Sequence, residues 1–176
     1  MKNDALIERL ATGAAAGRSR EDAALRERTA LQGQRPWAIV ICCSDSRVIP
    51  ERIFDAGLGE LFVIRVAGNV LDRHQLGSVE YAAAHLHCRL VLVLGHSGCG
   101  AVGAALAGES GGFIGYITEE IAAAVGEESD PLRACEKNVL YAVSRLREEF
   151  SAHPEIDAEI VGALYDILTG EVRFLD

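Results

Sequence analysis

Two short loops carry the residue types that bind transition metals and move protons. The first loop reads Cys43-Ser44-Asp45-Ser46-Arg47, and the second reads Gly95-His96-Ser97-Gly98-Cys99-Gly100. Two thiolates and one imidazole form a ligand set typical of zinc, and three protein ligands leave the fourth tetrahedral position open for chemistry. His96 and Cys99 are separated by one turn of chain, so both side chains can reach the same ion.

Each loop follows an apolar run that is typical of a strand buried on both faces of a parallel sheet. Such runs occupy residues 37–42, 61–66 and 90–94. Open parallel sheets bind ligands beyond the carboxyl ends of their strands. If the first and third runs are neighbours in the sheet, Cys43 meets His96 and Cys99 at that edge.

Helical patterns separate the predicted strands. Apolar residues at helical spacing predict a helix around residues 76–86 and another around residues 114–121, and Asp130-Pro131 predicts the start of a third. The buried stripe of this third helix is expected to comprise Leu132, Cys135, Val139, Val143, Leu146 and Phe150. Strands that alternate with helices imply a mostly parallel sheet flanked by helices.

The two ends of the chain predict further elements. Residues 1–32 are expected to form an N-terminal helical arm that is interrupted within residues 13–17 and ended by Gln34-Arg35-Pro36. Residues 159–166 and 172–175 are expected to form a strand pair. The sequence therefore predicts a single α/β domain over residues 1–176.

Composition excludes several classes of protein. With 176 residues, 49% hydrophobic residues and a net charge of −9, the chain is globular rather than disordered, and it is unsuited to a nucleic-acid or anionic membrane partner. Its apolar runs are far shorter than the about 18 residues that span a bilayer. The first ten residues lack the apolar stretch of a signal peptide, and five cysteines without a C-x-x-C pair favour reduced thiols. We expect a cytoplasmic protein.

The remaining cysteines and a histidine-rich segment have simpler interpretations. Cys42, Cys88 and Cys135 are expected to pack as small hydrophobic residues. A second metal cluster at residues 85–88 is disfavoured, because residues two apart do not share a helix face.

A serine hydrolase is an alternative to the metal site. Residues 95–99 nearly match G-x-S-x-G, with Asp130 and His153 following in the order of that fold. However, Cys99 replaces the last glycine, and this interpretation leaves the Cys43–Arg47 loop unexplained.

The two loops in order, C-x-D-x-R and H-x-x-C-G, with Arg65-Val-Ala-Gly-Asn69 between them, resemble the β-class carbonic anhydrases. The likeness extends to residues 33–36, 77–82 and 161–172. The resemblance implies a carbonic anhydrase (carbonate dehydratase, a zinc lyase) with one zinc per chain. Such an enzyme catalyses the reversible hydration of carbon dioxide to bicarbonate and a proton by metal-bound hydroxide.

The resemblance also implies residue roles. Cys43, His96 and Cys99 match the zinc ligands, while Asp45 and Arg47 match a catalytic carboxylate–guanidinium pair in which Asp45 can become a fourth ligand in a closed state. The positions that match substrate-binding residues are Gln34 (reaching across a subunit interface), Phe62, Ala67, Tyr81 and Gly100. Val40 stands where members with a bicarbonate regulatory pocket have tryptophan, so that form of regulation is not expected.

Two further alternatives use the same metal site. One is hydrolysis of carbonyl sulfide or carbon disulfide, and the other is a non-catalytic zinc- or bicarbonate-binding module. The resemblance implies self-association as a dimer or tetramer, with the N-terminal helices embracing the partner.

Overall fold

The computed structural model describes residues 4–20, 22–153 and 156–175. The chain divides into two compact units, Met1–Gln34 and Arg35–Asp176. The expectation of one domain over the whole chain stays a prediction.

The N-terminal unit holds two helices, α1 (Asp4–Arg20) and α2 (Ala23–Gln32). The predicted interruption within residues 13–17 is wrong, because α1 runs through them without a break. A glycine inside a helix costs only about 1 kcal/mol, and the three alanines between Gly13 and Gly17 favour helix. The second helix begins where the Asp22 carboxylate accepts hydrogen bonds from Ala24 N (2.9 Å) and Leu25 N (3.3 Å).

The second helix ends at the predicted bound of the arm, residue 32. It stops at Gln32, and Gly33 follows with φ 77°, a conformation that glycine adopts without steric cost. Residues 1–3 and 21 of the expected arm lie outside the described residues. Four large apolar side chains of this unit are exposed: Leu6, Ile7, Leu10 and Leu31.

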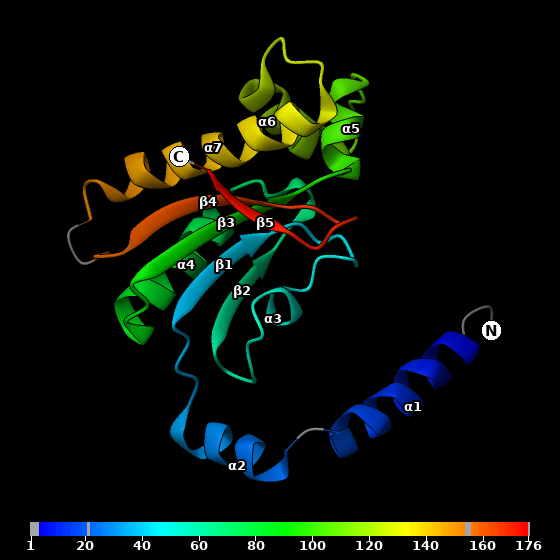
Figure 1. The fold of residues 1–176 in the computed structure, drawn as a ribbon, viewed down its shortest axis with the longest axis vertical. Helices are drawn as coiled ribbons and strands as arrows, with labels where there is room; N and C mark the ends of the chain where they lie inside the picture. Colours follow the sequence, from blue (N-terminus) through cyan, green and yellow to red (C-terminus); the bar gives the residue numbers. More distant parts are fainter. Residues whose placement is uncertain (1–3, 21, 154–155, 176) are drawn as a thin grey trace. The chain divides into compact units, whose positions relative to one another are not determined.

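The second unit is built on a five-stranded sheet with the order β2-β1-β3-β4-β5 (Figure 1). Its strands are β1 (Ala38–Cys42), β2 (Leu61–Arg65), β3 (Leu90–His96), β4 (Glu159–Tyr165) and β5 (Val172–Leu175). The first four are parallel, and β5 pairs antiparallel with β4. These findings confirm the predicted α/β class, the mostly parallel sheet and the C-terminal strand pair.

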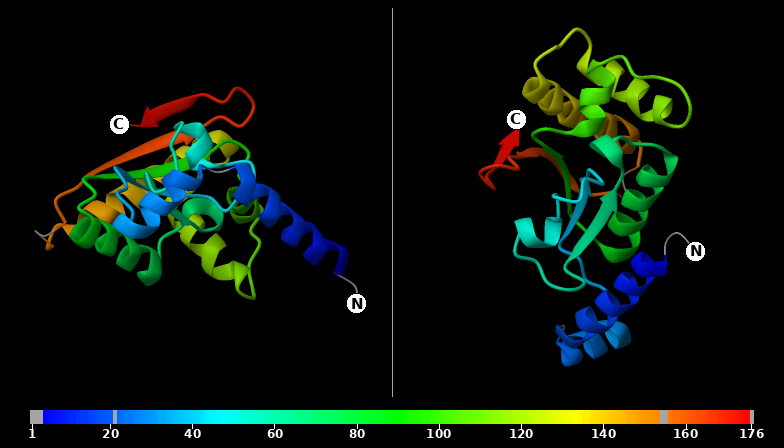
Figure 2. Two further views of the ribbon diagram at one scale, coloured as in Figure 1. Left: turned by 90° about the horizontal axis from the view of Figure 1, so that it is seen from below. Right: turned by 90° about the vertical axis from the view of Figure 1, so that its right-hand side faces the viewer.

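Helices connect the strands. They are α3 (Pro50–Ile53), the short 3-10 helix η1 (Ala67–Asn69), α4 (Arg73–Leu86), α5 (Gly100–Leu106), α6 (Ile114–Val125) and α7 (Pro131–Phe150). One face of the sheet packs against α4 and α7, and the other face meets apolar residues of and around α3. Figure 2 shows α4 and α7 on one side of the sheet and α3 on the other. Among the described residues no helix has the length and apolar character needed to cross a membrane.

The predicted start of helix α7 and most of its predicted buried stripe are confirmed. Asp130 caps it by accepting a hydrogen bond from Arg133 N (2.9 Å), and Pro131 occupies the first turn. The middle of the predicted stripe is buried, from Cys135 to Leu146. Leu132 is an error in the prediction, since its side chain is 45% exposed in the first turn, before the helix reaches the sheet.

Candidate metal centre

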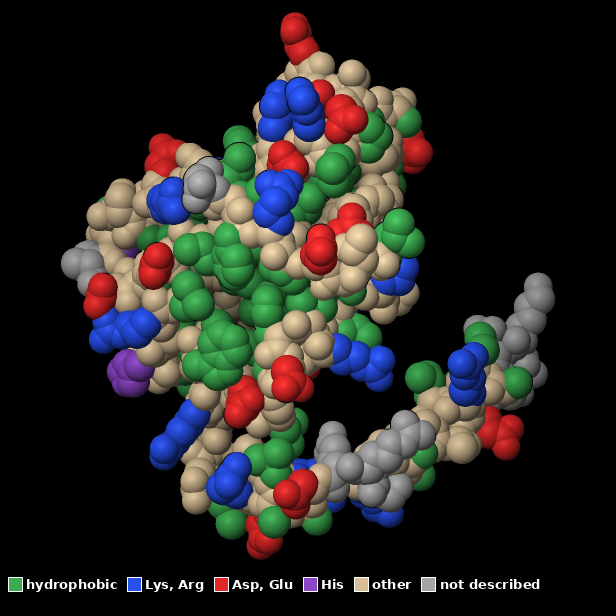
Figure 3. All heavy atoms as spheres, in the orientation of Figure 1, with side chains coloured by type: hydrophobic (Ala, Val, Ile, Leu, Met, Phe, Trp, Pro, Cys, Tyr) green, Lys and Arg blue, Asp and Glu red, His purple; other side chains and the backbone are tan. Residues whose placement is uncertain are grey.

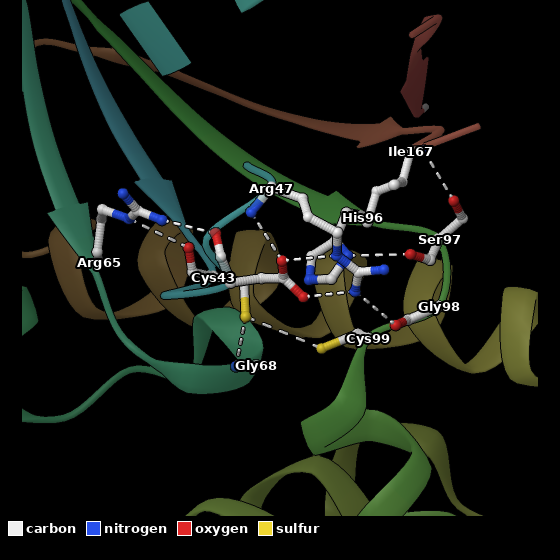
Figure 4. A network of polar contacts seen from close by, with 10 residues as sticks. Cys43, Arg47, Arg65, Gly68, His96, Ser97, Gly98, Cys99 and Ile167 are labelled. Atoms are coloured by element: carbon white, nitrogen blue, oxygen red, sulfur yellow. Dashed lines mark hydrogen bonds and ion pairs between the residues drawn. The ribbon is translucent and has the colours of Figure 1, made fainter. Parts of the chain in front are cut away.

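The sheet brings the two predicted loops together. Strands β1 and β3 are direct neighbours, with Cys42 opposite Leu94, so Cys43 and His96 emerge from the same edge. Cys99 follows at the N-cap of α5. The ligand atoms of Cys43, His96 and Cys99 all lie within 4.8 Å of one another, and all three residues are buried (Figure 4). In the described parts of the chain no other His, Cys, Asp or Glu cluster could hold a metal ion.

The spacing of the two sulfurs fits a shared zinc ion. The Sγ atoms of Cys43 and Cys99 are 4.0 Å apart. Two sulfurs at the usual Zn–S distance in a tetrahedral arrangement lie about 3.8 Å apart. The donor set and its spacing therefore match zinc.

The His96 imidazole supplies a second, independent test. Its Nδ1 lies 3.0 Å from the Ser97 carbonyl oxygen. A proton on Nδ1, donated to that carbonyl, leaves the lone pair on Nε2. Nε2 is buried and has no hydrogen-bond partner among the described residues. A buried polar atom without a partner is costly, and a metal ion at this position removes the cost.

The sulfur of Cys43 is surrounded by hydrogen-bond donors. The contact with Cys99 is the main cause that lowers the pKa of the Cys43 thiol to about 4, and the Gly68 N–H, 3.3 Å from Sγ, contributes in the same direction. The same shared proton, together with burial, raises the pKa of Cys99. The contact thus favours ionisation of Cys43 and opposes ionisation of Cys99.

Asp45 and Arg47 form the predicted pair beside the sulfurs. Arg47 Nε donates to Asp45 Oδ1 at 2.9 Å, and Nη2 donates to Oδ2 at 2.6 Å. These hydrogen bonds hold the pKa of the Asp45 carboxyl well below its usual range. Arg47 Nη2 also lies 3.5 Å from the Gly98 carbonyl oxygen, which ties the first loop to the second. Both carboxylate oxygens of Asp45 accept hydrogen bonds from Arg47, and its role as a fourth ligand stays a prediction.

Arg65 is a part of the site that was missed at the sequence level. Its Nη2 donates to the Asp45 carbonyl at 2.7 Å, and its Nε donates to the Cys43 carbonyl at 3.3 Å. Arg65 thus fixes the backbone of the first loop from the end of β2. Its place in the quoted Arg65–Asn69 motif was the available signal.

The predicted substrate residues fall into three groups. Ala67 begins η1 beside Gly68, and Gly100 begins α5 beside Cys99, so both adjoin the sulfurs along the chain. Phe62 and Tyr81 pair with one another, with ring centroids 6.2 Å apart. Gln34 is an exposed residue of the N-terminal unit.

The remaining cysteines are buried, as expected of packing residues. Burial raises the pKa of Cys42 to about 12, and its side chain joins the apolar cluster on the α3 face of the sheet. The Cys88 thiol donates to the Pro36 carbonyl (3.0 Å), and Cys135 packs in the cluster that includes Cys43 and Cys99.

The residues of the serine-hydrolase alternative have separate roles. Ser97 Oγ accepts a hydrogen bond from Ile167 N (3.0 Å), and Asp130 caps α7. His153 packs edge-on against Phe150. The structure gives this alternative no support.

Fold and site together define an α/β protein with a candidate sulfur- and nitrogen-ligated metal centre at the carboxyl edge of a parallel sheet. The sequence profile of the carbonic anhydrase family matches residues 38–172. Solved β-carbonic anhydrases share the fold over nearly the whole chain. The chain belongs to the β-carbonic anhydrase family.

Individual carbonic anhydrases are similar to this chain in sequence. A carbonic anhydrase of Mycolicibacterium smegmatis is 39% identical over 162 residues, covering 84% of this chain and 79% of that protein. Carbonic anhydrase 2 of Mycobacterium tuberculosis is 49% identical over 98 residues, covering 53% of this chain, and the match spans only 47% of that protein.

Two solved structures are similar across the fold. The β-carbonic anhydrase CcaA has a TM-score of 0.83 at 29% identity, covering 98% of this chain and 88% of that one. The β-carbonic anhydrase CafA of Aspergillus fumigatus has a TM-score of 0.80 at 28% identity, covering 98% of this chain and 91% of that one.

Proposed function

We propose that this protein catalyses the zinc-dependent, reversible hydration of carbon dioxide to bicarbonate and a proton. The observation that carries the proposal is the convergence of two sulfurs and an unpaired imidazole nitrogen beside an Asp–Arg pair. Membership of the β-carbonic anhydrase family supports it.

In this proposal Cys43, His96 and Cys99 hold one zinc ion per chain. Zinc supplies Lewis acidity: it lowers the pKa of a coordinated water so that hydroxide is available near neutral pH. A thiol that coordinates zinc is deprotonated, so Cys43 and Cys99 would both hold the metal as thiolates. The hydrogen bond from His96 Nδ1 to the Ser97 carbonyl keeps the ligating nitrogen unprotonated.

Asp45 orients the nucleophile in this mechanism. Its pair with Arg47 keeps the carboxylate ionised. Oδ1 accepts from both the backbone N–H and Nε of Arg47, whereas Oδ2 accepts one bond from Nη2 and so retains a lone pair. Asp45 accepts a hydrogen bond from the nucleophile and directs the reactive lone pair toward carbon dioxide. The same negative charge disfavours retention of the bicarbonate anion, which aids product release.

The substrate contacts rest on the family resemblance. We assign the Gly100 N–H and the Gln34 amide to polarise a substrate oxygen. Phe62, Ala67 and Tyr81 are assigned to the apolar wall, which suits a small substrate without charge.

We further propose a cytoplasmic homo-oligomer, a dimer or tetramer, in which Gln34 serves a neighbouring subunit. Exposed apolar side chains on α1 support self-association, as does a hollow of about 120 Å³ on the α3 face of the sheet. Figure 3 shows hydrophobic side chains gathered on that face. The lining residues are Trp37, Ala38, Val40, Phe54, Leu90, Leu92, Val161 and Phe174. Two β-carbonic anhydrases of the filamentous ascomycete Sordaria macrospora, to which this chain is similar in structure, are tetrameric.

The test is stopped-flow carbon dioxide hydration on protein of measured zinc content. The parent chain is expected to be active, and Asp45→Ala is expected to keep its zinc and lose activity about a hundredfold. Asp157→Ala is the matched control, because it removes the carboxylate of an exposed Asp–Arg pair formed with Arg89 on the amino-terminal side of β3. Zinc-loaded parent protein without hydration activity, or full activity in Asp45→Ala, would contradict the proposal.

A further inference from the structure

Helix α7 carries a buried amide on its otherwise apolar inner face. Asn138 is only 3% exposed and lies between Cys135 and Val139 in the buried stripe. Burying an amide costs free energy unless its hydrogen bonds are made. The Nδ2 of Asn138 donates to the carbonyl oxygen of Gly68 at 2.8 Å, a buried contact between residues far apart in the sequence.

Gly68 is also the residue whose N–H reaches the Cys43 sulfur, at 3.3 Å. It has φ +67°, and a Cβ there would lie 2.6 Å from Ile121 Cδ1 and 3.1 Å from Ala101 Cβ. The turn is therefore held on one side by packing and on the other by Asn138. A rotation of this turn would swing the N–H away from the sulfur.

We propose that Asn138 is a positioning residue for the metal centre: by fixing the Gly68 carbonyl, it aims the Gly68 N–H at the sulfur of Cys43. The inference rests on the proposed function, because it takes Cys43 as a metal ligand. A hydrogen bond to a thiolate withdraws electron density from the sulfur and fixes its direction. Partners that orient a ligand in this way typically change metal affinity about 10- to 100-fold when they are removed.

A purely structural role for Asn138 predicts a different outcome. A residue that serves only the packing of α7 would lower the free energy of unfolding and leave the bound metal unchanged. Thr118 is the matched comparison, since it is a buried polar residue (2% exposed) whose hydroxyl donates to carbonyls of its own helix, Ile114 and Gly115. Thr118→Val and Asn138→Leu each replace a buried polar side chain by an apolar one of similar shape, but only the second releases Gly68.

The experiment measures metal binding in the full chain. Zinc affinity is obtained by competition with a chromophoric chelator, and the sulfur-to-metal charge-transfer band is recorded after cobalt(II) substitution. Asn138→Leu is expected to weaken zinc binding about tenfold and to shift the cobalt band to longer wavelength, because the sulfur lone pair rises in energy when its N–H partner leaves. Thr118→Val is expected to match the parent in both measurements.

Asn138→Ser is measured in parallel. Its shorter side chain leaves the Gly68 carbonyl without a donor, and it does not have to fit a bulky apolar group into the site of the amide. Parent-like affinity and band position in the folded Asn138 variants would overturn the inference, as would equal changes in Thr118→Val. A parent chain that binds neither zinc nor cobalt would instead refute the metal site itself, so the two failures are distinguishable.

Discussion

Gly68→Ala tests whether the turn beneath Cys43 requires glycine. The native φ of +67° is left-handed, and an alanine in that conformation costs about 1–2 kcal/mol. The new Cβ would also lie 2.6 Å from Ile121 Cδ1, inside van der Waals contact. Forcing an extra methyl into a packed core costs about 1–3 kcal/mol. Alanine restricts the unfolded chain and returns about 0.4–1 kcal/mol. We expect a net loss of about 1–5 kcal/mol in the free energy of unfolding.

Urea unfolding of the metal-free protein measures this loss. Gly77→Ala is the control, since Gly77 lies inside α4, a Cβ there meets nothing within 4 Å, and φ is not positive. That change is expected to stabilise the protein by about 0.5–1 kcal/mol. If Gly68→Ala unfolds at the same urea concentration as the parent, the reasoning about this turn is wrong.

A second variant separates the two causes. Ile121→Val removes the Cδ1 atom that the new Cβ would strike, and alone it costs about 0.5–1.5 kcal/mol. Combined with Gly68→Ala, it is expected to recover the steric part of the loss and to leave the backbone part. Strictly additive losses would show that the contact with Ile121 contributes nothing.

Two further predictions concern pH and subunit exchange. In metal-free, reduced protein, folding lowers the pKa of Cys43 to about 4, so the unfolded state binds an extra proton above that pH and stability should rise as the pH increases from about 4 to 6.5. Above pH 6.5 the raised pKa of His96 opposes this rise, and near pH 9 the raised pKa of Cys99 opposes it further. Urea unfolding from pH 4.5 to 8.5 checks this, and Cys43→Ser should flatten the rise, whereas an equally steep profile would contradict it. For subunit exchange, inactive Gln34→Ala and Asp45→Ala chains, unfolded and refolded together in equal amounts, should regain about a quarter of the parent activity, because half of the dimers have one intact site. A mixture that stays inactive while mixed dimers form would show that Gln34 does not act across the interface.

The strands and the convergence of the candidate metal ligands could be predicted because short-range patterns determine them. Apolar runs that are too short for helices located β1, β2 and β3 to within two residues at each end. Since parallel strands present their carboxyl ends at one edge, the two loops after β1 and β3 had to converge once these strands were neighbours. The Asp130-Pro131 start of α7 was equally local, because the cap is made within the first turn.

The sequence predictions were wrong where a local signal is weaker than the effect of neighbouring residues or of tertiary packing. Gly13 and Gly17 suggested an interruption, yet both stay helical, since the helix-favouring residues between and around them outweigh the cost of glycine. Leu132 shares the period of the buried stripe, but its burial depends on where the sheet ends beneath α7. No spacing rule along one helix contains that information.

The residues proposed to orient Cys43 could not be predicted from the sequence, for the same reason. Asn138 interrupts an apolar stripe, and a polar residue in such a place is a signal, but the sequence does not identify its partner 70 residues away. Gly68 belonged to a recognised motif, although its hydrogen bond to a sulfur depends on a turn conformation that a motif does not specify.

The hydrogen bond from Asn138 to the Gly68 carbonyl depends on how closely α7 approaches the sheet. A Cβ on Gly95 of β3 would lie 2.4 Å from Val139, and one on Gly162 of β4 would lie 2.9 Å from the same side chain. Two adjacent strands therefore use glycine where α7 crosses them, which lets the helix pack closer than larger residues would allow. Val139 directly follows Asn138, and Gly95 directly precedes His96, so the place where α7 packs against β3 lies next to both the Asn138 amide and the imidazole along the chain. The geometry of the metal centre is thus set by helix–sheet packing as well as by the two loops that supply its ligands.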